Sequence, residues 1–505
     1  MKTHYTRILL LIAFLAFQQN AFAQTRMWHQ EIAQTNIDLD GPTSVLGSVT
    51  INVPADGKVE VRFDGYCIAD TNDMIVLAAS DTNDWDVNDG NIGVFAHDID
   101  VDKLSFSHTR SYSISAGSKT YYAVGQNYVC TDGSGFASVY GMLTVVYFPD
   151  TSNSMLEHAG FDYNGNVRGA PVAVQSVNLN PTVPGKVVVR FDGLCTPDAG
   201  DRIYLAASNS ASWGPFDGSV YVENDNPAVC VSDIPFSHTR VYSISPGFYT
   251  FYAVAENATE MNGSGDIAIY ASLTVSFYPD AGNVVVNSMP IFSQAVSLSN
   301  GPMDLGMLNL NAMTDGNVLV HFDGICESDT GDRIILAASD TLDYTSGSGS
   351  IEIEAWSTNV NENSFAHSTA YAVNAGSHAF HALGDNDFET DGTGDATIYG
   401  TLLAIFFPMM NTSVGDDPAS SLDINIYPNP SNELATISFN LTGRQYVKID
   451  LYDITGRWIR TLADGNWNAG RRELSFDARN EQAGIYFLKF DLGNSSRTEK
   501  LTLIK

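Results

Sequence analysis

Hydrophobic and polar residues alternate over long stretches of this 505-residue chain. One such stretch reads Lys58-Val59-Glu60-Val61-Arg62-Phe63-Asp64. A period of two is typical of a β-strand that has one face in a core and the other in water. Shorter runs at 112–114 and 120–124 flank a turn at Ala116-Gly117, and an aromatic, β-branched run at 140–148 fits a central strand. The apolar positions of residues 24–408 nowhere follow a sustained 3.6-residue period, so we expect an all-β protein.

The pattern occurs three times between positions 24 and 408, with a period of about 130 residues. Each copy carries Phe-Asp-Gly followed two residues later by Cys, then Leu-Ala-Ala-Ser, then a Phe-x-His step, and closes on an aromatic-Pro pair. The equivalent residues are Cys67, Cys195 and Cys326; Ser80, Ser208 and Ser339; His108, His238 and His367; and Pro149, Pro279 and Pro408. Solenoid repeats are far shorter, so these are tandem domains, with predicted bounds of 24–150, 160–280 and 290–408.

Short strands at intervals of about ten residues predict a β-sandwich or jelly roll of about 8–10 strands in each copy. A Gly-x-x-x-aromatic-aromatic step before the closing strands loosely resembles the jelly rolls of complement globular heads and tumour necrosis factor. The connections near 150–160 and 280–290 are short. They allow either separate beads or a pseudo-threefold assembly.

The C-terminal segment has a different pattern, with landmarks in a fixed order. They are Asn425-Ile426-Tyr427-Pro428-Asn429-Pro430, Ile449-Asp450-Leu451-Tyr452-Asp453-Ile454-Thr455-Gly456-Arg457, Ala483-Gly484-Ile485-Tyr486-Phe487-Leu488-Lys489 and Thr498-Glu499-Lys500-Leu501. Residues 423–505 resemble the type A C-terminal sorting domain of the type IX secretion system of Bacteroidota. The resemblance implies contact with that secretion machinery, export across the outer membrane, and cleavage at the polar joint 409–422. Apolar runs at 435–439, 447–452, 473–476 and 485–490 predict a small β-sandwich.

The N-terminus agrees with export. Lys2 and Arg7 precede an apolar run at 8–17, and small residues lead to a cleavage site between Ala23 and Gln24. Residues 1–23 are therefore interpreted as a signal peptide. Later apolar runs fall short of the roughly 20 residues that a membrane helix needs, so we expect no membrane span and an extracellular or outer-surface location.

Charge narrows the range of partners. The net charge is -33, but residues 423–505 contain eleven Lys and Arg against ten Asp and Glu. The remaining fourteen basic and forty-eight acidic residues lie upstream, a net charge of -34. Such a surface repels phosphate backbones, which disfavours nucleic-acid binding. It is compatible with neutral polysaccharide, with divalent cations, or simply with solubility.

Five cysteines in an exported chain suggest disulfides and one remaining thiol. We predict the pairs Cys67–Cys130 and Cys195–Cys230, although the second cysteine of each pair lies at a different repeat position. Cys326 is then free and buried as a small hydrophobe, or it forms an intermolecular bridge.

One aromatic residue follows each Leu-Ala-Ala-Ser by five positions: Trp85, Trp213 and Tyr344. A flat ring in a polar loop can stack on a sugar while nearby Asp and Asn bind hydroxyl groups. The alternative is that each ring folds back to cover the edge of its own sandwich.

The acidic loop residues Asp385, Asp387, Glu389 and Asp391 are candidate calcium ligands, because calcium favours several oxygen ligands from one loop. A turn-forming role is the alternative. Three aspartates recur in each copy where a strand meets a loop, and we interpret them as turn caps, with cation binding as the alternative. They are Asp64, Asp70 and Asp73; Asp192, Asp198 and Asp201; and Asp323, Asp329 and Asp332. The three repeated histidines lack clustered partners, so we interpret them as structural.

The sequence contains no catalytic motif with a recognisable frame. Three similar domains favour a non-catalytic binding or adhesion protein, for which a polysaccharide or cell-surface glycan is the candidate partner. The alternatives are an extracellular polysaccharide hydrolase and a purely structural surface or matrix protein. Apart from calcium, the sequence indicates no cofactor.

Overall fold

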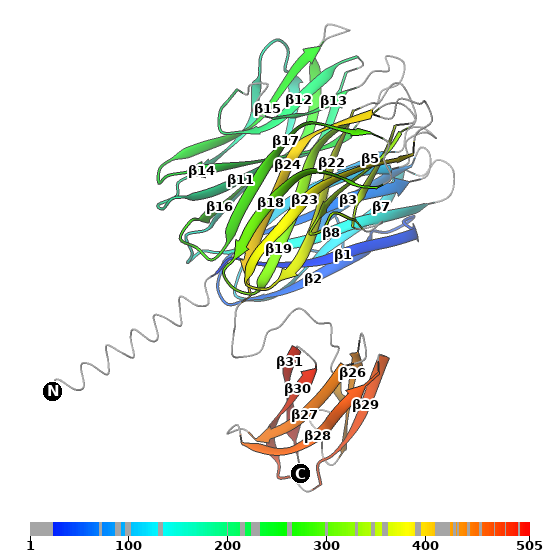
Figure 1. The fold of residues 1–505 in the computed structure, drawn as a ribbon, viewed down its shortest axis with the longest axis vertical. Coiled ribbons are helices and arrows are strands. Elements are labelled where there is room, and N and C mark those ends of the chain that lie inside the picture. Colours follow the sequence, from blue (N-terminus) through cyan, green and yellow to red (C-terminus); the bar gives the residue numbers. More distant parts are fainter. Residues whose placement is uncertain are drawn as a thin grey trace, which may run out of the picture. The chain divides into compact units, whose positions relative to one another are not determined.

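The chain forms two compact units, Met1–Met409 and Met410–Lys505 (Figure 1). The computed structural model describes residues 24–504 except for 70–72, 86–91, 96–102, 130–134, 199, 213–217, 224–232, 260–264, 298–300, 329–331, 345–348, 356–361, 389–394, 410–424, 428–430, 432–433, 442–444, 454–456, 469, 480 and 493–494. The predicted signal peptide and, apart from Met409, the predicted joint 409–422 lie outside the described residues. Gln24, the predicted mature N-terminus, is the first residue described.

The first repeat is a jelly roll of two four-stranded antiparallel sheets. Its strands are β1 (Arg26–Asp38), β2 (Ser44–Val53), β3 (Gly57–Ala69), β4 (Met74–Ser80), β5 (Ile92–Phe95), β6 (Lys103–Ile114), β7 (Gly117–Val129) and β8 (Phe136–Pro149). One sheet has the order β1-β8-β3-β6 and the other β2-β7-β4-β5. Eight strands wound in this order into two facing sheets define the jelly-roll architecture.

The second and third repeats have the same strand order, so the prediction of three all-β sandwich repeats is confirmed. The second repeat contains β9 (Met155–Asn166), β10 (Val172–Leu179), β11 (Gly185–Pro197), β12 (Arg202–Ser208), β13 (Val220–Glu223), β14 (Ile234–Ile244), β15 (Tyr249–Thr259) and β16 (Asp266–Pro279). The third contains β17 (Val285–Ser297), β18 (Met303–Ala312), β19 (Gly316–Glu327), β20 (Asp332–Ser339), β21 (Ile351–Ala355), β22 (Glu362–Val373), β23 (Gly376–Phe388) and β24 (Asp395–Pro408).

The glycine of each Phe-Asp-Gly step is required where the third and eighth strands approach closely. Gly65 of β3 pairs with Gly141 of β8. A Cβ on Gly65 would lie 2.0 Å from the carbonyl oxygen of Tyr140, and one on Gly141 would lie 2.1 Å from that of Asp64. Neither backbone oxygen can move without breaking the ladder, so side chains are excluded at both positions.

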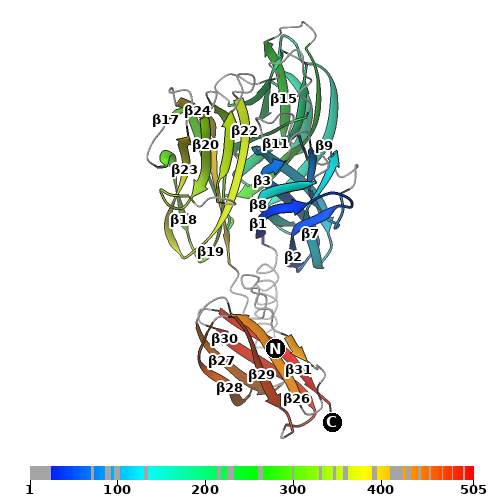
Figure 2. The ribbon, with the colours of Figure 1, turned by 90° about the vertical axis from the view of Figure 1, so that its right-hand side faces the viewer.

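The three repeats pack against one another in a cyclic order, which answers the question that the short connections left open. The residue after Phe-Asp-Gly enters the core of a neighbouring repeat: Leu194 enters the first, Ile325 the second and Tyr66 the third. Strands β6, β14 and β22 all contact one another. Figure 2 shows the three repeats side by side. The repeats therefore form a pseudo-threefold assembly.

The polar face of each third strand is buried at these junctions, and two predictions about it are wrong. Glu60, Arg62 and Asp64 were expected to face water, but they are 6%, 1% and 1% exposed. Asp64 and its equivalents Asp192 and Asp323 lie inside strands and do not cap turns. A period-two pattern separates the two faces of a strand, but a polar face can meet another domain as well as water.

The C-terminal unit is a separate small sandwich, as predicted. Its strands are β25 (Asn425–Tyr427), β26 (Leu434–Leu441), β27 (Gln445–Asp453), β28 (Trp458–Trp467), β29 (Gly470–Asp477), β30 (Gly484–Leu492) and β31 (Ser495–Leu503). The sheet β25-β26-β29 and the sheet β28-β27-β30-β31 enclose a core that includes Ile437, Leu451 and Phe490. Within the described part of the chain, no helix has the length and hydrophobicity that a membrane crossing requires.

Candidate functional site

A buried charged cluster joins the three repeats. Arg190 of β11 donates to Glu60 of β3 at 2.8 Å, and the Ser276 hydroxyl donates to the same carboxylate at 2.6 Å. Burial by itself would raise the pKa of Glu60, but the Arg190 and Arg62 guanidiniums outweigh it and lower that pKa. The carboxylate is thus held in its charged form by groups from two repeats.

The third repeat enters the cluster through His321. Its Nδ1 lies 3.5 Å from Asp64 Oδ2, and its Nε2 lies 3.4 Å from Asp323 Oδ2. Arg62 Nε lies 3.3 Å from Asp64 Oδ1. Burial alone would raise the pKa of Asp64, yet Arg62 and His321 bring it to about 2. These groups are almost completely inaccessible to solvent, so the cluster is a contact between the repeats and is closed to a ligand.

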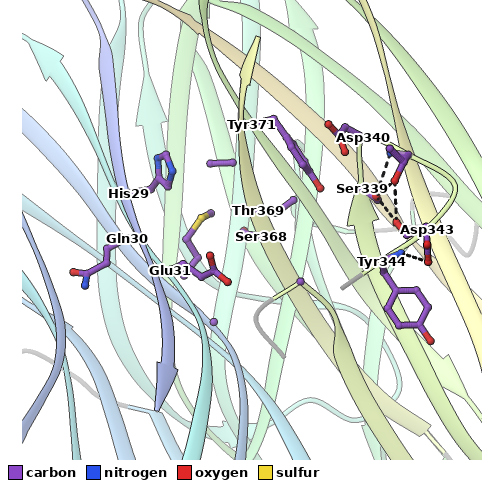
Figure 3. Close-up of a pocket in the computed structure, with 15 residues that line it drawn as sticks. His29, Gln30, Glu31, Ser339, Asp340, Asp343, Tyr344, Ser368, Thr369 and Tyr371 are labelled. Atoms are coloured by element: carbon purple, nitrogen blue, oxygen red, sulfur yellow. Dashed lines mark hydrogen bonds between the residues drawn. The ribbon is translucent and has the colours of Figure 1, made fainter. Parts of the chain in front are cut away.

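An open pocket of about 450 Å³ lies at the junction of the first and third repeats (Figure 3). One wall is formed by β1 of the first repeat and the opposite wall by the loop after β20 of the third. Residues of β22 lie between these two walls. The lining includes His29, Gln30, Glu31, Met142, Ser339, Asp340, Thr341, Asp343, Tyr344, Gly349, Ser368, Thr369 and Tyr371.

The chemistry of this lining is acidic and rich in hydrogen-bonding groups. Glu31, on one side, and Asp340 and Asp343, on the other, are exposed carboxylates. Hydroxyl groups, one amide and one imidazole line the pocket together with Met142, Ala370 and two glycines, and neither Lys nor Arg is among the lining residues. Such a surface accepts hydrogen bonds from hydroxyl or ammonium groups and repels anions.

The loop of Tyr344 is held by its own side chains. Ser339 Oγ donates to the carbonyl oxygen of Asp343 at 2.6 Å, and the Tyr344 amide donates to Asp343 Oδ1 at 2.9 Å. The Tyr344 hydroxyl donates to Asp385 Oδ2 of β23 at 3.0 Å. The ring is therefore half-buried and fixed in orientation at the edge of the pocket.

The equivalent loop of the first repeat is built in the same way. Ser80 Oγ donates to the Asp84 carbonyl at 2.8 Å, and Trp85 Nε1 donates to Gln126 Oε1 at 2.7 Å. Trp85 also contacts the exposed Tyr128 edge-on, with ring centroids 6.1 Å apart. Trp213 lies outside the described residues. Sugar stacking by the three predicted aromatics stays a prediction.

The repeated histidines have structural contacts. His108, His238 and His367 accept, through Nδ1, the backbone N–H of the second alanine in Leu-Ala-Ala-Ser, at 2.9, 2.9 and 3.0 Å. These amides lie where the fourth strand of each repeat extends past the shorter fifth strand. The imidazole therefore accepts a backbone N–H that the fifth strand does not reach. Burial lowers the pKa of His108 to about 3 and that of His238 to about 4, so both remain neutral acceptors.

The structure describes one of the four predicted calcium ligands in full. Asp385 is 5% exposed and accepts the Tyr344 hydroxyl. The side chains of Asp387, Glu389 and Asp391 lie outside the described residues, so calcium binding stays a prediction. Among the described residues, no group of three or more His, Cys, Asp or Glu side chains is placed to hold a metal ion.

The predicted disulfides have no support. Cys67, Cys195 and Cys326 are free thiols, and each is completely buried in the core of its own repeat. Burial raises the pKa of Cys67 to about 12 and raises that of the other two as well. The predicted partners Cys130 and Cys230 lie outside the described residues. The prediction that Cys326 is free and buried is confirmed.

Of the pocket residues, sequence reasoning identified only Tyr344. It missed His29, Glu31 and Thr369, which come from strands far apart in the chain. One signal was present in the repeats. Thr369 follows the His-Ser step of the third copy, whereas an arginine follows the His-Thr step of each of the other two.

Comparison with known proteins identifies only the C-terminal part of the chain. Residues 425–505 match the family described as "Secretion system C-terminal sorting domain". No curated protein matches the chain. The sorting domain means that the protein is exported by the type IX secretion system to the cell surface or the extracellular space, as predicted.

Solved structures give weak likenesses. Dimeric latent PorU from Porphyromonas gingivalis is 12% identical over 72% of this chain and 35% of its own, with a TM-score of 0.15. PNGase F, a glycosylasparaginase from Flavobacterium meningosepticum, is 9% identical over 51% and 97%, with a TM-score of 0.24. A triple jelly roll protein of an archaeal virus turret is 8% identical over 76% and 90%, with a TM-score of 0.18. Scores this low carry no argument about function, and the chain spans about a third of PorU.

Proposed function

We propose that this exported protein, whose residues 425–505 are a sorting domain of the type IX secretion system, binds glycans outside the cell in the pocket between its first and third repeats. The proposal assigns it no catalytic step. The glycan contacts the three-repeat unit, and the sorting domain directs export.

The composition of the pocket carries this proposal. Sugars present hydroxyl groups around a ring with apolar C–H faces, so sugar sites combine hydrogen-bonding side chains with an aromatic ring. The pocket has carboxylates on both sides, hydroxyl groups on its floor and the fixed ring of Tyr344 at its edge. The fixed orientation of the ring also reduces the entropy lost on binding.

The test is a glycan array probed with the full chain, followed by titration of the bound glycan. Replacing Tyr344 by Ala removes the ring and should weaken binding about tenfold, the equivalent of roughly 1.4 kcal/mol. Tyr344→Phe keeps the ring and should bind more nearly as the wild type does. Phe248→Ala is the matched control, because Phe248 is 68% exposed and belongs to the second repeat. Equal binding by Tyr344→Ala and the wild type would refute the proposal.

A polysaccharide hydrolase is the second candidate, because the pocket places carboxylates on both of its sides. Glycosidases use a pair of carboxyl groups that flank the scissile bond. Incubation of the array glycans with the protein, followed by measurement of their chain length, separates the two functions. Shortening that is lost in Glu31→Gln would favour the hydrolase.

A further inference from the structure

The pocket occurs at one of three equivalent junctions, and a single strand position distinguishes them. Arg110, Arg240 and Thr369 occupy the same place in the sixth strand of their repeats. Each is paired with the valine that precedes Phe-Asp-Gly by two residues: Val61, Val189 and Val320, respectively. Two junctions thus carry a long cationic side chain where the third carries a small hydroxyl side chain.

In the second repeat the arginine occupies the space that is open in the third. Gly218 precedes Val220 of β13 by two residues, just as Gly349 precedes Ile351 of β21. Gly349 lines the pocket. A Cβ on Gly218 would lie 2.9 Å from Nη1 of Arg240.

Arg110 of the first repeat reaches the equivalent space at the junction with the second repeat. Gly160 of β9 is paired with Ser272, just as Glu31 of β1 is paired with Met142 at the equivalent register. Glu31 lines the pocket. A Cβ on Gly160 would lie 3.3 Å from Nη1 of Arg110, with no other atom within 4 Å.

We propose that the protein has one glycan site per chain, that Thr369 opens it, and that its ligands are neutral or amino sugars. The other two junctions are closed by Arg110 and Arg240. The lining contains Glu31, Asp340 and Asp343 without a Lys or Arg, so it repels uronic and sulfated sugars. The identity of the ligand as a glycan rests on the proposed function.

Thr369→Arg tests the proposal, because the same strand position already accommodates an arginine in two repeats. The new guanidinium would face Glu31, which provides a counter-charge. Isothermal titration uses cellotetraose, a glucosamine tetramer and tetragalacturonate. We expect the wild type to bind the first two with a stoichiometry of one and not to bind the third. We expect Thr369→Arg to weaken binding at least a hundredfold while its Tm stays within a few degrees of wild type.

The reverse change provides a matched gain of function. Arg110→Thr combined with Gly160→Glu copies the open junction at the boundary of the first and second repeats. The space around Gly160 admits the new side chain once the arginine is removed. The stoichiometry should rise from one to two. A wild-type stoichiometry of three, or unchanged binding by Thr369→Arg, would overturn the inference.

A measurement without glycan separates this inference from the proposed function. Thr369→Cys is treated with 2-aminoethyl methanethiosulfonate, a small cation that forms a disulfide with an accessible thiol. In the folded protein the new thiol should react at least tenfold faster than the thiols of the wild type. Fast labelling with no glycan bound would reject the proposed function but retain the open site. Labelling no faster than in the wild type would show that the pocket is closed and overturn the inference.

Discussion

The buried histidines predict how acid weakens the three-repeat unit. In the folded protein the pKa of His108 is about 3 and that of His238 about 4, because both rings are buried. In the unfolded chain a histidine has a pKa of about 6.5. As the pH falls below about 6.5, these histidines are protonated in the unfolded chain but stay neutral in the folded protein. The free energy of unfolding therefore decreases as the pH falls from about 6.5 to the folded pKa.

The size of the effect follows from the pKa difference. At pH 4.5 a histidine with an unfolded pKa of about 6.5 and a folded pKa of about 3 destabilises the fold by about 2.7 kcal/mol relative to pH 7.5. Two such groups cost about 5 kcal/mol, which is a large part of the stability of a typical domain. For a unit of nearly 400 residues the conversion is about 1.2 °C per kcal/mol, so His108 alone accounts for a decrease in Tm of about 3 °C.

His108→Asn isolates this contribution. The amide oxygen of Asn can accept the Ala79 N–H, but the side chain does not titrate in this range. Any packing cost appears at both pH values and cancels in the difference. Calorimetry at pH 7.5 and 4.5 should show a decrease in Tm about 3 °C smaller for the variant than for the wild type. His378→Asn is the control, because His378 lies near the start of β23 and its hydrogen bond to the Asn374 carbonyl is exposed. An equal decrease in His108→Asn and the wild type would refute the reasoning.

Two further predictions concern buried groups. Arg190→Met removes the ion-pair partner of the buried Glu60 carboxylate, so it should destabilise the unit by about 3–5 kcal/mol in chemical denaturation. Adding Glu60→Leu, the residue type of the equivalent Leu319, should restore most of the loss, and a double variant as unstable as the single one would contradict this. For Cys67, alkylation without reductant should label the thiol after denaturation and leave it unlabelled in the native protein, since the thiol is buried and its pKa is about 12. Failure to label the denatured protein would instead support the predicted disulfide.

The strand pattern was predictable because it depends on local sequence. Val59, Val61 and Phe63 face the core of their own sandwich, as the period of two indicates. The fate of Glu60 and Arg62 on the opposite face was not predictable in this way. The sequence of a strand shows that one face is polar, but it does not show whether that face contacts water or the polar surface of another domain.

The site shows the same division. Tyr344 could be singled out because its polar loop and its place after Leu-Ala-Ala-Ser are local features. Its neighbours across the pocket, Glu31 and Thr369, are separated by more than 300 positions in the chain, and only the closing of the third repeat on the first brings them together. The repeats show Thr369 where the other two copies have arginine. Only the structure shows that this position lies at the junction between repeats and lines the pocket.

The sequence by itself determined the export signal, the three-fold repetition and the all-β class, because each of these depends on short-range patterns. Only the tertiary structure decided that the repeats close into a ring, that the charged face of β3 lies inside it, and that Glu31 and Thr369 line one pocket. These properties depend on which surfaces meet. Burying the charge of Glu60 or Arg190 costs free energy, and this cost is offset only when a neighbouring repeat supplies the opposite charge.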